Sequence, residues 1–247
     1  MLTIRVIHDP PQSGPLNMAA DETLLNRVGA GDSPPTLRFY QWDPPTISLG
    51  YFQKYADYEA LPPPAGELPV VRRLTGGGAI LHDRELTYSL ALPVDHPLLS
   101  GGPNRLYELA HDAVIACLSE AGIDSWRGCE TDDSTAARGP FFCFARRHCL
   151  DVLVGDRKLA GSAQRRTRTG VLQHGSIIFE QRFAQQPVAA VREATDLAPA
   201  DLADRFAAAF AAQTGCRLDP GEWTEAEREA TGLLANKYAG RDWLRRR

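Results

Sequence analysis

Apolar residues recur at intervals of three and four positions in several segments of the chain, a spacing that predicts amphipathic helices. The apolar face of the first helix is expected to comprise Leu16, Ala20, Leu24 and Val28. Thr224-Glu225-Ala226-Glu227 has the form of a capping box, which marks a helix start. The predicted helices cover Leu16–Val28, Asn104–Ala121, Ala200–Gln213 and the segment from Thr224 onward.

Runs rich in β-branched and aromatic residues predict short strands between these helices. Gly155-Asp156 predicts the turn of a hairpin, and the small polar residues of Gly128–Gly139 predict a mobile loop. Early strands, interspersed helices and a helical C-terminal segment together predict an α+β fold, with one mixed β-sheet core flanked by helices in a single domain over residues 1–247. The predicted strands cover Leu2–Ile7, Thr36–Trp42, Thr46–Tyr51, Pro69–Arg73, Leu86–Leu92, Leu150–Val154, Lys158–Ala163 and Gly170–Phe179.

The composition is that of an ordinary globular protein, with 247 residues, 43% hydrophobic and 23% charged. A formal net charge of −4 gives no overall field that would attract nucleic acid, so no nucleic-acid partner is expected. The chain contains no run of 18 apolar residues and its first residues do not resemble a signal peptide, so neither a membrane partner nor export is expected. These features predict a cytoplasmic location.

The five cysteines form an odd set without a Cys-x-x-Cys pair, which favours reduced thiols over a disulfide framework. Cys143, His148 and Cys149 lie close in sequence, but no second ligand pair has matching spacing, so no metal site is expected. The cysteines are Cys117, Cys129, Cys143, Cys149 and Cys216.

Three consecutive glycines, Gly76-Gly77-Gly78, interrupt the segment from Val71 to Asp83. Because glycines have no side chains, a bound molecule can lie directly against the backbone amides of this segment. The motif therefore predicts a ligand-binding loop between two strands. A flexible surface loop is the structural alternative. Arg72 and Arg73 either meet an acidic ligand or remain solvated at the end of a strand, and His82 either lines a pocket or caps the strand with Asp83.

A second segment, Phe142–Gln164, combines thiols with an amine. A thiolate is a strong nucleophile toward thioesters, and Arg146, Arg147 and His148 supply cations beside Cys143. Lys158 is flanked by apolar Leu159 and Ala160, a setting in which burial would lower its pKa and let it act as a base.

Spacing alone does not choose between Cys143 and Cys149. If Gly155-Asp156 is a two-residue turn, Leu153 opposes Lys158, and Asp151 and Cys149 share that face. Cys143 would lie about 33 Å from Leu153 along a straight strand and would have to fold back to reach Lys158. Each cysteine could equally be a small core thiol.

The glycine segment and Arg157-Lys158-Leu159-Ala160-Gly161-Ser162-Ala163-Gln164 together resemble the biotin/lipoate-protein ligase and octanoyltransferase family. Leu16–Glu22, Gln173-His174-Gly175-Ser176 and the closing Lys237-Tyr238 with Trp243 are also similar, so the resemblance covers nearly the whole chain. It implies the catalytic-domain fold of that family, a mixed sheet flanked by helices. The separate C-terminal domain of many lipoate ligases is not expected here.

Within this resemblance, Lys158 matches the lysine that holds the acyl carbonyl, and Cys143 matches the acyl-accepting cysteine of cysteine-dependent octanoyltransferases. Lipoate ligases lack that cysteine and carry Asn-Asp where this chain has Leu150-Asp151. Cys149 replaces a residue that is typically aromatic, and the loop before it is more basic than usual. The residues expected to bind substrate are Arg72, Thr75, Gly76, Gly77, Gly78, His82, Gly161, Ser162, Ala163 and His174, although His174 could also be a satisfied core residue.

The activity implied is transfer of octanoyl from acyl carrier protein through a Cys143 thioester to a lysine of a lipoyl domain or glycine-cleavage H protein. Amides of the glycine loop or of Gly161-Ser162 would stabilise the oxyanion, and Lys158 would help remove a proton. This route requires no cofactor. Three alternatives remain: an ATP-dependent lipoate ligase, an amidotransferase between lipoyl domains, and a non-catalytic acyl-binding protein.

Overall fold

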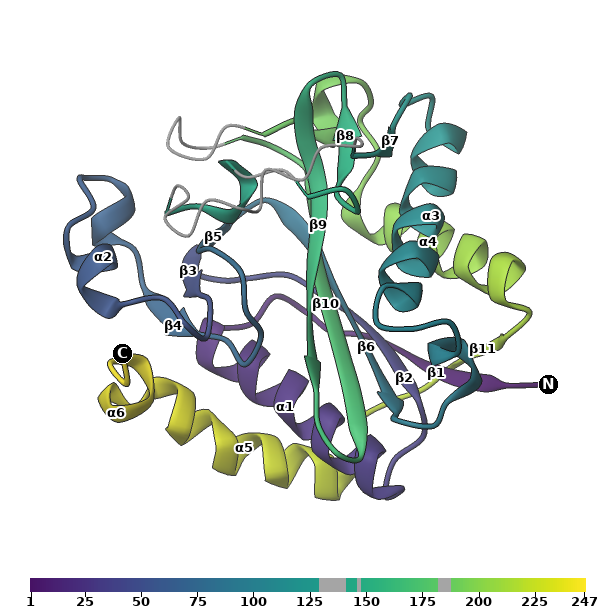
Figure 1. The fold of residues 1–247 in the computed structure, drawn as a ribbon, viewed down its shortest axis with the longest axis horizontal. Helices are drawn as coiled ribbons and strands as arrows, with labels where there is room; N and C mark the ends of the chain where they lie inside the picture. The colour runs from purple at the N-terminus through teal and green to yellow at the C-terminus, as the bar shows by residue number, and fades with distance from the viewer. Residues whose placement is uncertain (129–140, 146–147, 182–187) are drawn as a thin grey trace.

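A mixed β-sheet forms the centre of the molecule (Figure 1). The structure is a computed structural model that describes residues 1–128, 141–145, 148–181 and 188–247. Strand β1 pairs in parallel with both of its neighbours, while every other pair in this sheet is antiparallel, which confirms the predicted mixed sheet. Within the described ranges, the order of its strands is β11 (Arg217–Pro220), β1 (Thr3–His8), β2 (Thr36–Tyr40), β6 (Glu85–Pro93), β10 (Gly170–Ile178), β9 (Arg157–Arg166), β8 (Val152–Val154) and β7 (Trp126–Arg127).

A smaller sheet supports the glycine motif. Strand β3 (Thr46–Leu49) lies between β4 (Val70–Arg72), which is parallel to it, and β5 (Ile80–His82), which is antiparallel. The glycine loop joins β4 to β5 and packs over the end of β3, where a Cβ added to Gly50 would lie only 1.9 Å from the Gly77 carbonyl oxygen. The motif is therefore a loop between two strands, as the sequence predicts.

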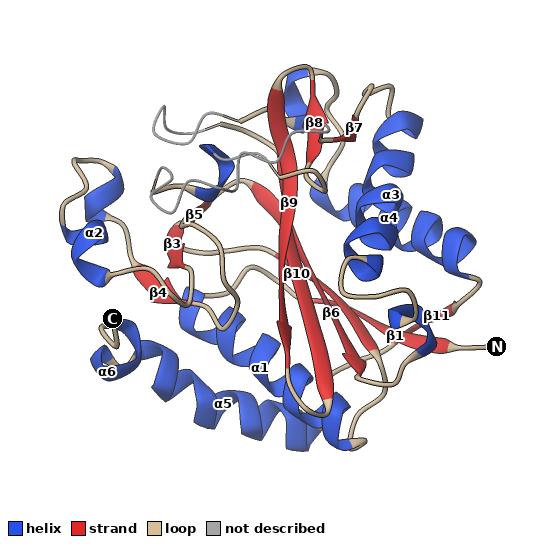
Figure 2. Ribbon diagram, viewed as in Figure 1, coloured by secondary structure: helices blue, strands red, loops and turns tan. Residues whose placement is uncertain are grey.

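Helices cover both faces of the large sheet (Figure 2). Helices α3 and α4 pack over one face and enclose the largest apolar core, whereas α1 packs on the other face and is covered by α5. The described helices are α1 (Gly14–Ala30), α2 (Tyr55–Glu59), α3 (Arg105–Glu120), α4 (Pro199–Thr214), α5 (Glu225–Ala239) and α6 (Arg241–Leu244), with short 3₁₀ segments at Ala65–Glu67, Pro97–Leu99, Cys143–Ala145 and Val191–Glu193.

Strand β6 alternates apolar and polar residues, yet it is buried on both faces. Leu90 and Leu92 belong to the core beneath α3 and α4, while Ala91 faces the apolar cluster of α1. Thr87 and Ser89, which alternate with these apolar residues, are also buried. The alternating residues of β6 therefore face an apolar core on one side and a buried, partly polar layer on the other, so that neither face meets solvent.

Most predicted elements are present with ends shifted by a few residues, and the capping box is confirmed because Thr224 Oγ1 accepts from the Glu227 amide at 3.2 Å. The predicted face of the first helix is partly wrong. Leu16 is 38% exposed, and Leu25 is buried instead, because α1 packs between the sheet and α5. The sequence does not predict the short elements α2, β7 and β11, and the helix predicted from Thr224 onward is divided at Gly240 into α5 and α6. Residues 129–139 of the predicted mobile loop lie outside the described residues.

Among the described residues, no helix has both the length and the apolar character that crossing a bilayer requires.

Candidate active site

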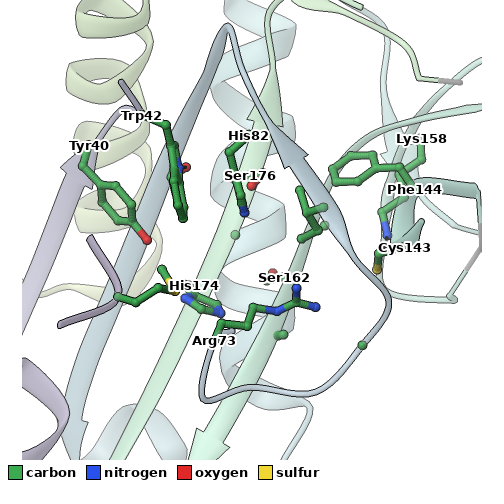
Figure 3. Close-up of a pocket in the computed structure, with 17 residues that line it drawn as sticks. Tyr40, Trp42, Arg73, His82, Cys143, Phe144, Lys158, Ser162, His174 and Ser176 are labelled. Atoms are coloured by element: carbon green, nitrogen blue, oxygen red, sulfur yellow. Dashed lines mark hydrogen bonds between the residues drawn. The ribbon is translucent and has the colours of Figure 1, made fainter. Parts of the chain in front are cut away.

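A largely apolar cavity opens beside the glycine loop and contains about 470 Å³ of empty space, counted to its mouth. Tyr40 and Trp42 lie at one end of it, and Cys143, Phe144 and Lys158 lie at the other (Figure 3). The remaining lining residues come from α1, the glycine loop and strands β5, β6, β9 and β10: Met18, Arg73, Gly77, Ile80, His82, Thr87, Gly161, Ser162, Ala163, His174, Gly175 and Ser176.

Backbone hydrogen bonds hold Cys143 against the glycine loop. The Cys143 amide donates to the Ala79 carbonyl at 2.7 Å, and the Ala79 amide donates to the Phe141 carbonyl at 2.9 Å. A Cβ on Gly78 would lie 2.9 Å from the Cys143 nitrogen, so this close approach requires glycine. The chain thus folds back to the site through a 3₁₀ turn instead of extending along the hairpin.

Lys158 brings its amine to the same point from strand β9. Its Nζ lies 4.0 Å from Cys143 Sγ, 2.9 Å from Asp151 Oδ1 and 4.9 Å from the centre of the Phe144 ring. Leu153 opposes Lys158, as expected from the turn. The Lys158 side chain passes over Gly161, where a Cβ would lie 2.4 Å from Cε.

The expected lowering of the Lys158 pKa is wrong. Burial does act to lower this pKa, but the electrostatic interactions of Lys158 with Cys143 and Asp151 outweigh burial and raise the pKa above its ordinary value. In the resting protein Lys158 is therefore an ammonium group and not a base. Asp151, which sequence reasoning placed on this face without a role, is the residue responsible together with Cys143.

Cys149 lies elsewhere. Its sulfur is 3.8 Å from Nδ1 of the adjacent His148, and Cys149 does not line the cavity. Of the two thiols that the spacing left open, Cys143 is the one beside Lys158. The four described cysteines, Cys117, Cys143, Cys149 and Cys216, are free.

Arg73 shapes the glycine loop from within. It is almost fully buried, and its Nη2 donates to the carbonyls of Gly76 at 2.7 Å and Gly78 at 2.6 Å. Nε donates to Thr75 Oγ1 at 3.1 Å. Burial lowers the pKa of Arg73 to about 10, against the opposing electrostatic effect of Cys143. A solvated strand-end arginine was one expectation here, and the burial contradicts it.

Arg72, unlike Arg73, does not line the cavity, and it is also fully buried. Its guanidinium donates to the carbonyls of Gly50 at 2.9 Å, Gln53 at 2.7 Å and Leu244 at 2.9 Å, which joins the segment after β3 to α6. Arg72 is therefore not solvated either, and it does not line the cavity. Its expected role in substrate binding stays a prediction.

Two histidines of the cavity wall are each paired with a carboxylate. His174 Nδ1 lies 2.8 Å from Asp21 Oδ2, and its Nε2 lies 2.7 Å from Thr75 Oγ1. Desolvation of Asp21 is outweighed by His174 and Arg38, so the pKa of Asp21 is lowered. His174 is thus both a satisfied interior residue and part of the lining.

His82 has the same arrangement. Its Nδ1 lies 2.7 Å from Glu85 Oε1 and its Nε2 lies 2.7 Å from Ser48 Oγ. The ring stacks on Trp42, with 3.8 Å between centroids and 8° between planes. Burial lowers the pKa of His82 despite Glu85. His82 therefore lines the cavity in a neutral form and holds Trp42 in place.

Of the other residues expected to bind substrate, some line the cavity and the rest hold the lining residues in place. Gly77, Gly161, Ser162 and Ala163 line the cavity. Thr75, Gly76 and Gly78 support it through the contacts with His174, Arg73 and Cys143 given above. Ser162 is hydrogen-bonded to buried His111, a residue that the sequence did not single out. Within the described ranges, no three His, Cys, Asp or Glu side chains gather in a way that could hold a metal ion.

The model of the lipoyl protein ligase A/B catalytic domain matches residues 13–210. The chain belongs to this family. A curated octanoyltransferase LipM from Kyrpidia tusciae is 37% identical over 98% of this chain and 98% of its own length. Another octanoyltransferase LipM, from Moorella thermoacetica, is 40% identical over 94% of this chain and 93% of its own length.

Solved structures of the lipoyl protein ligase family share the fold. A lipoate-protein ligase A bound with ATP superposes with a TM-score of 0.78 at 22% identity, covering 98% of each chain. The bipartite lipoate protein ligase of Thermoplasma acidophilum, described with its E2 lipoyl domain, gives a TM-score of 0.75 at 20% identity, covering 99% of this chain and 96% of that one. At these identities the likeness supports the fold, a mixed sheet with flanking helices.

Proposed function

We propose that this protein is an octanoyltransferase that carries the acyl group on Cys143 between an acyl carrier protein and a lysine of a lipoyl domain or glycine-cleavage H protein. Relatives named octanoyltransferase LipM match it over nearly its whole length. The observation that carries the mechanism is the 4.0 Å separation of Cys143 Sγ and Lys158 Nζ at one end of a largely apolar cavity.

The cavity accommodates the fatty chain. Burial of the seven aliphatic carbons contributes about 6 kcal/mol, at roughly 0.8 kcal/mol for each carbon. With the carbonyl carbon at Cys143, the chain extends toward Tyr40 and Trp42 at the far end (Figure 3). The binding energy of this remote segment holds the thioester carbonyl beside the sulfur.

In the first half-reaction the Cys143 thiolate attacks the carbonyl carbon of the thioester. A bond forms between this carbon and Cys143 Sγ, and the bond to the carrier sulfur breaks. The Lys158 ammonium stabilises the developing negative charge on the carbonyl oxygen, and it then gives a proton to the departing carrier thiolate. The products are an octanoyl thioester on Cys143, a neutral Lys158 and a carrier thiol.

Acylation itself changes the proton affinity of Lys158. The thioester cannot ionise, so the electrostatic interaction with Cys143 that helps to raise the Lys158 pKa disappears. Burial is then opposed by Asp151 alone, and the Lys158 pKa falls. The amine is therefore an acid in the first half-reaction and a base in the second.

In the second half-reaction the neutral amine of the acceptor lysine attacks the Cys143 thioester. A carbon–nitrogen bond forms, the bond to Sγ breaks, and Lys158 takes the proton that the attacking nitrogen loses. The Cys143 thiolate and the Lys158 ammonium are restored, so the cycle closes without an external proton or nucleotide. Amide formation from a thioester is downhill and requires no ATP.

The test is intact mass spectrometry after incubation with octanoyl-acyl carrier protein alone. The expected result is a gain of one octanoyl group in the wild type and in Cys149→Ser, and none in Cys143→Ser. Addition of an acceptor domain should then discharge the acyl group. If Cys143→Ser transfers octanoate at the normal rate, the mechanism is wrong.

A second arm of the same experiment addresses the ligase alternative. The protein is incubated with ATP, lipoate and an acceptor domain, without any thioester. Formation of an acyl-adenylate or of lipoylated acceptor would contradict the proposal, which expects neither.

The proton transfer by Lys158 is tested with Lys158→Arg. This variant keeps a cation at the site but cannot donate and recover a proton.

A further inference from the structure

A series of cations and aromatic rings runs along the surface from α5 to β9. The Lys237 ammonium lies 4.0 Å from the centre of the Trp243 ring, and the Arg246 guanidinium lies 4.7 Å from the same ring. Arg246 also lies 4.3 Å from the Tyr51 ring, and Arg165 lies 5.3 Å from it. Figure 1 shows the C-terminal end of the chain beside β4, and the Tyr55 amide of α2 donates to the Arg247 carbonyl at 2.9 Å.

Three arginines of this region have no carboxylate partner among the described residues: Arg165, Arg246 and Arg247. The neighbouring Arg245, by contrast, pairs with Glu59 at 2.9 Å. Arg247 lies 5.2 Å from the ring of Phe52, which is 65% exposed. These three arginines, with Tyr51 and Phe52, are called the arginine platform below.

Aromatic rings hold the platform guanidinium groups in place. A guanidinium that stacks on a ring stays charged and keeps its outward donors, and it loses little side-chain entropy when an anion binds. Unpaired, oriented arginines are suited to bidentate contacts with carboxylate or phosphate oxygens. Since the whole chain has a net charge of −4, this attraction for anions is local to the platform.

The platform borders the site but does not enter it. The Tyr51 amide donates to the Thr75 carbonyl at 2.8 Å, which joins the platform to the glycine loop. Gln53 Nε2 donates to the Phe141 carbonyl at 3.1 Å, two residues before Cys143. A partner on the platform is thus separated from the Cys143 sulfur by the thickness of these two segments.

We propose that the arginine platform docks the acyl donor, a carrier protein with an acidic surface that presents the acyl group on a long phosphodiester-linked arm. The inference rests on the proposed function and adds the docking site. A long arm can cross the glycine loop while the body of its protein stays on the platform. An acceptor lysine has only its own side chain, so its domain must lie directly over Cys143.

The experiment compares three octanoyl donors in single-turnover acylation of Cys143: the carrier protein, octanoyl-phosphopantetheine and the neutral octanoyl N-acetylcysteamine. The variant is Arg165→Glu with Arg246→Glu, and the control is Arg217→Glu on β11 at the opposite edge of the sheet. Charges at the edge of a protein–protein interface mainly change the rate constant of association. The variant should therefore lose about tenfold or more in the second-order rate constant of acylation by the carrier protein, and this rate constant should depend less on salt.

The same variant should acylate normally with the neutral thioester. If the variant loses as much acylation rate with octanoyl-phosphopantetheine as with the carrier protein, the platform contacts the phosphate of the arm. A smaller loss with octanoyl-phosphopantetheine means that the platform contacts the acidic surface of the carrier protein. Acylation kinetics that the substitutions leave unchanged with all three donors would overturn the proposal. Failure of the wild type to acylate Cys143 with any donor would instead reject the proposed function.

Discussion

The Lys158 ammonium lies 4.0 Å from the Cys143 sulfur, although fifteen residues separate them and the two approach from different elements. The interaction with Cys143 helps to raise the pKa of the buried lysine, and the ammonium places a positive charge beside the sulfur. A pair of this kind suits a transfer reaction, because acylation of the sulfur removes the charge that retained the proton on the amine.

Asp151→Asn should lower the Lys158 pKa, because the substitution removes one of the two anions that raise it. The first half-reaction requires the ammonium form, so the decline of its rate at high pH should begin at a lower pH than in the wild type. The loss in acylation rate relative to the wild type should therefore be larger at high pH than at neutral pH. Single-turnover acylation with a neutral thioester, followed across pH, measures both effects.

The matched control for Asp151 is Asp156→Asn, in the exposed hairpin turn. It should leave the pH profile unchanged. An Asp151→Asn profile identical to that of the wild type would show that Asp151 does not hold the proton on Lys158.

Gly161→Ala should reduce acylation by about tenfold or more with little effect on stability. The added Cβ would lie 2.4 Å from Cε and 2.6 Å from Nζ of Lys158, so the end of this flexible side chain must move away from Cys143. Thermal unfolding and acylation rates separate the two effects. Gly232→Ala, in α5 with nothing near the new atom, should keep full activity and gain up to about 1 kcal/mol. Normal activity of Gly161→Ala would mean that the position of Lys158 is unimportant.

Trp42→Ala should shift the acyl preference toward longer chains. Trp42 lies at the end of the cavity opposite Cys143, where it stacks on His82 and donates to Thr87 Oγ1 at 2.8 Å (Figure 3). Two further methylenes that become buried would favour decanoyl over octanoyl by about tenfold relative to the wild type. Competition between the two thioesters measures the ratio. Trp126→Ala, at a half-exposed tryptophan of β7, is the control, and an unchanged ratio for Trp42→Ala would contradict the orientation of the chain.

Glu227 should make the fold sensitive to acid. Although burial opposes ionisation, hydrogen bonds from Arg5 and Ser33 lower the pKa of Glu227 from 4.5 to about 2. Because the pKa of Glu227 is lower in the folded protein than in the unfolded one, the ionised carboxylate contributes its full stabilisation above pH 4.5. This stabilisation is lost as the pH falls from 4.5 toward 2, and it adds about 3 kcal/mol to the free energy of unfolding.

Glu227→Gln tests this contribution by chemical denaturation at several pH values. The variant should be about 3 kcal/mol less stable at pH 7, and the difference from the wild type should shrink as the pH approaches 2. Glu229→Gln, exposed on the same helix, should behave like the wild type. A constant difference at all pH values would rule out the ionised carboxylate as its source.

The sequence by itself determined the local features of this protein. The hairpin at Gly155-Asp156 and the pairing of Leu153 with Lys158 follow from turn length and side-chain alternation, which act over a few residues. Helix periodicity and the capping box are local for the same reason. The glycine loop was recognisable because only glycines permit such a close approach of backbone to backbone, as between Gly78 and Cys143.

Only the tertiary structure decided which thiol meets the amine. The choice depends on the backbone bridge between Ala79 and Phe142, which are far apart in sequence, and no local pattern encodes that pairing. The burial of Arg72 and Arg73 likewise depends on carbonyls supplied by several loops. The charge of Lys158 also required the fold, because a pKa reflects the balance of desolvation and nearby charges in space, whereas its apolar sequence neighbours indicated only the desolvation.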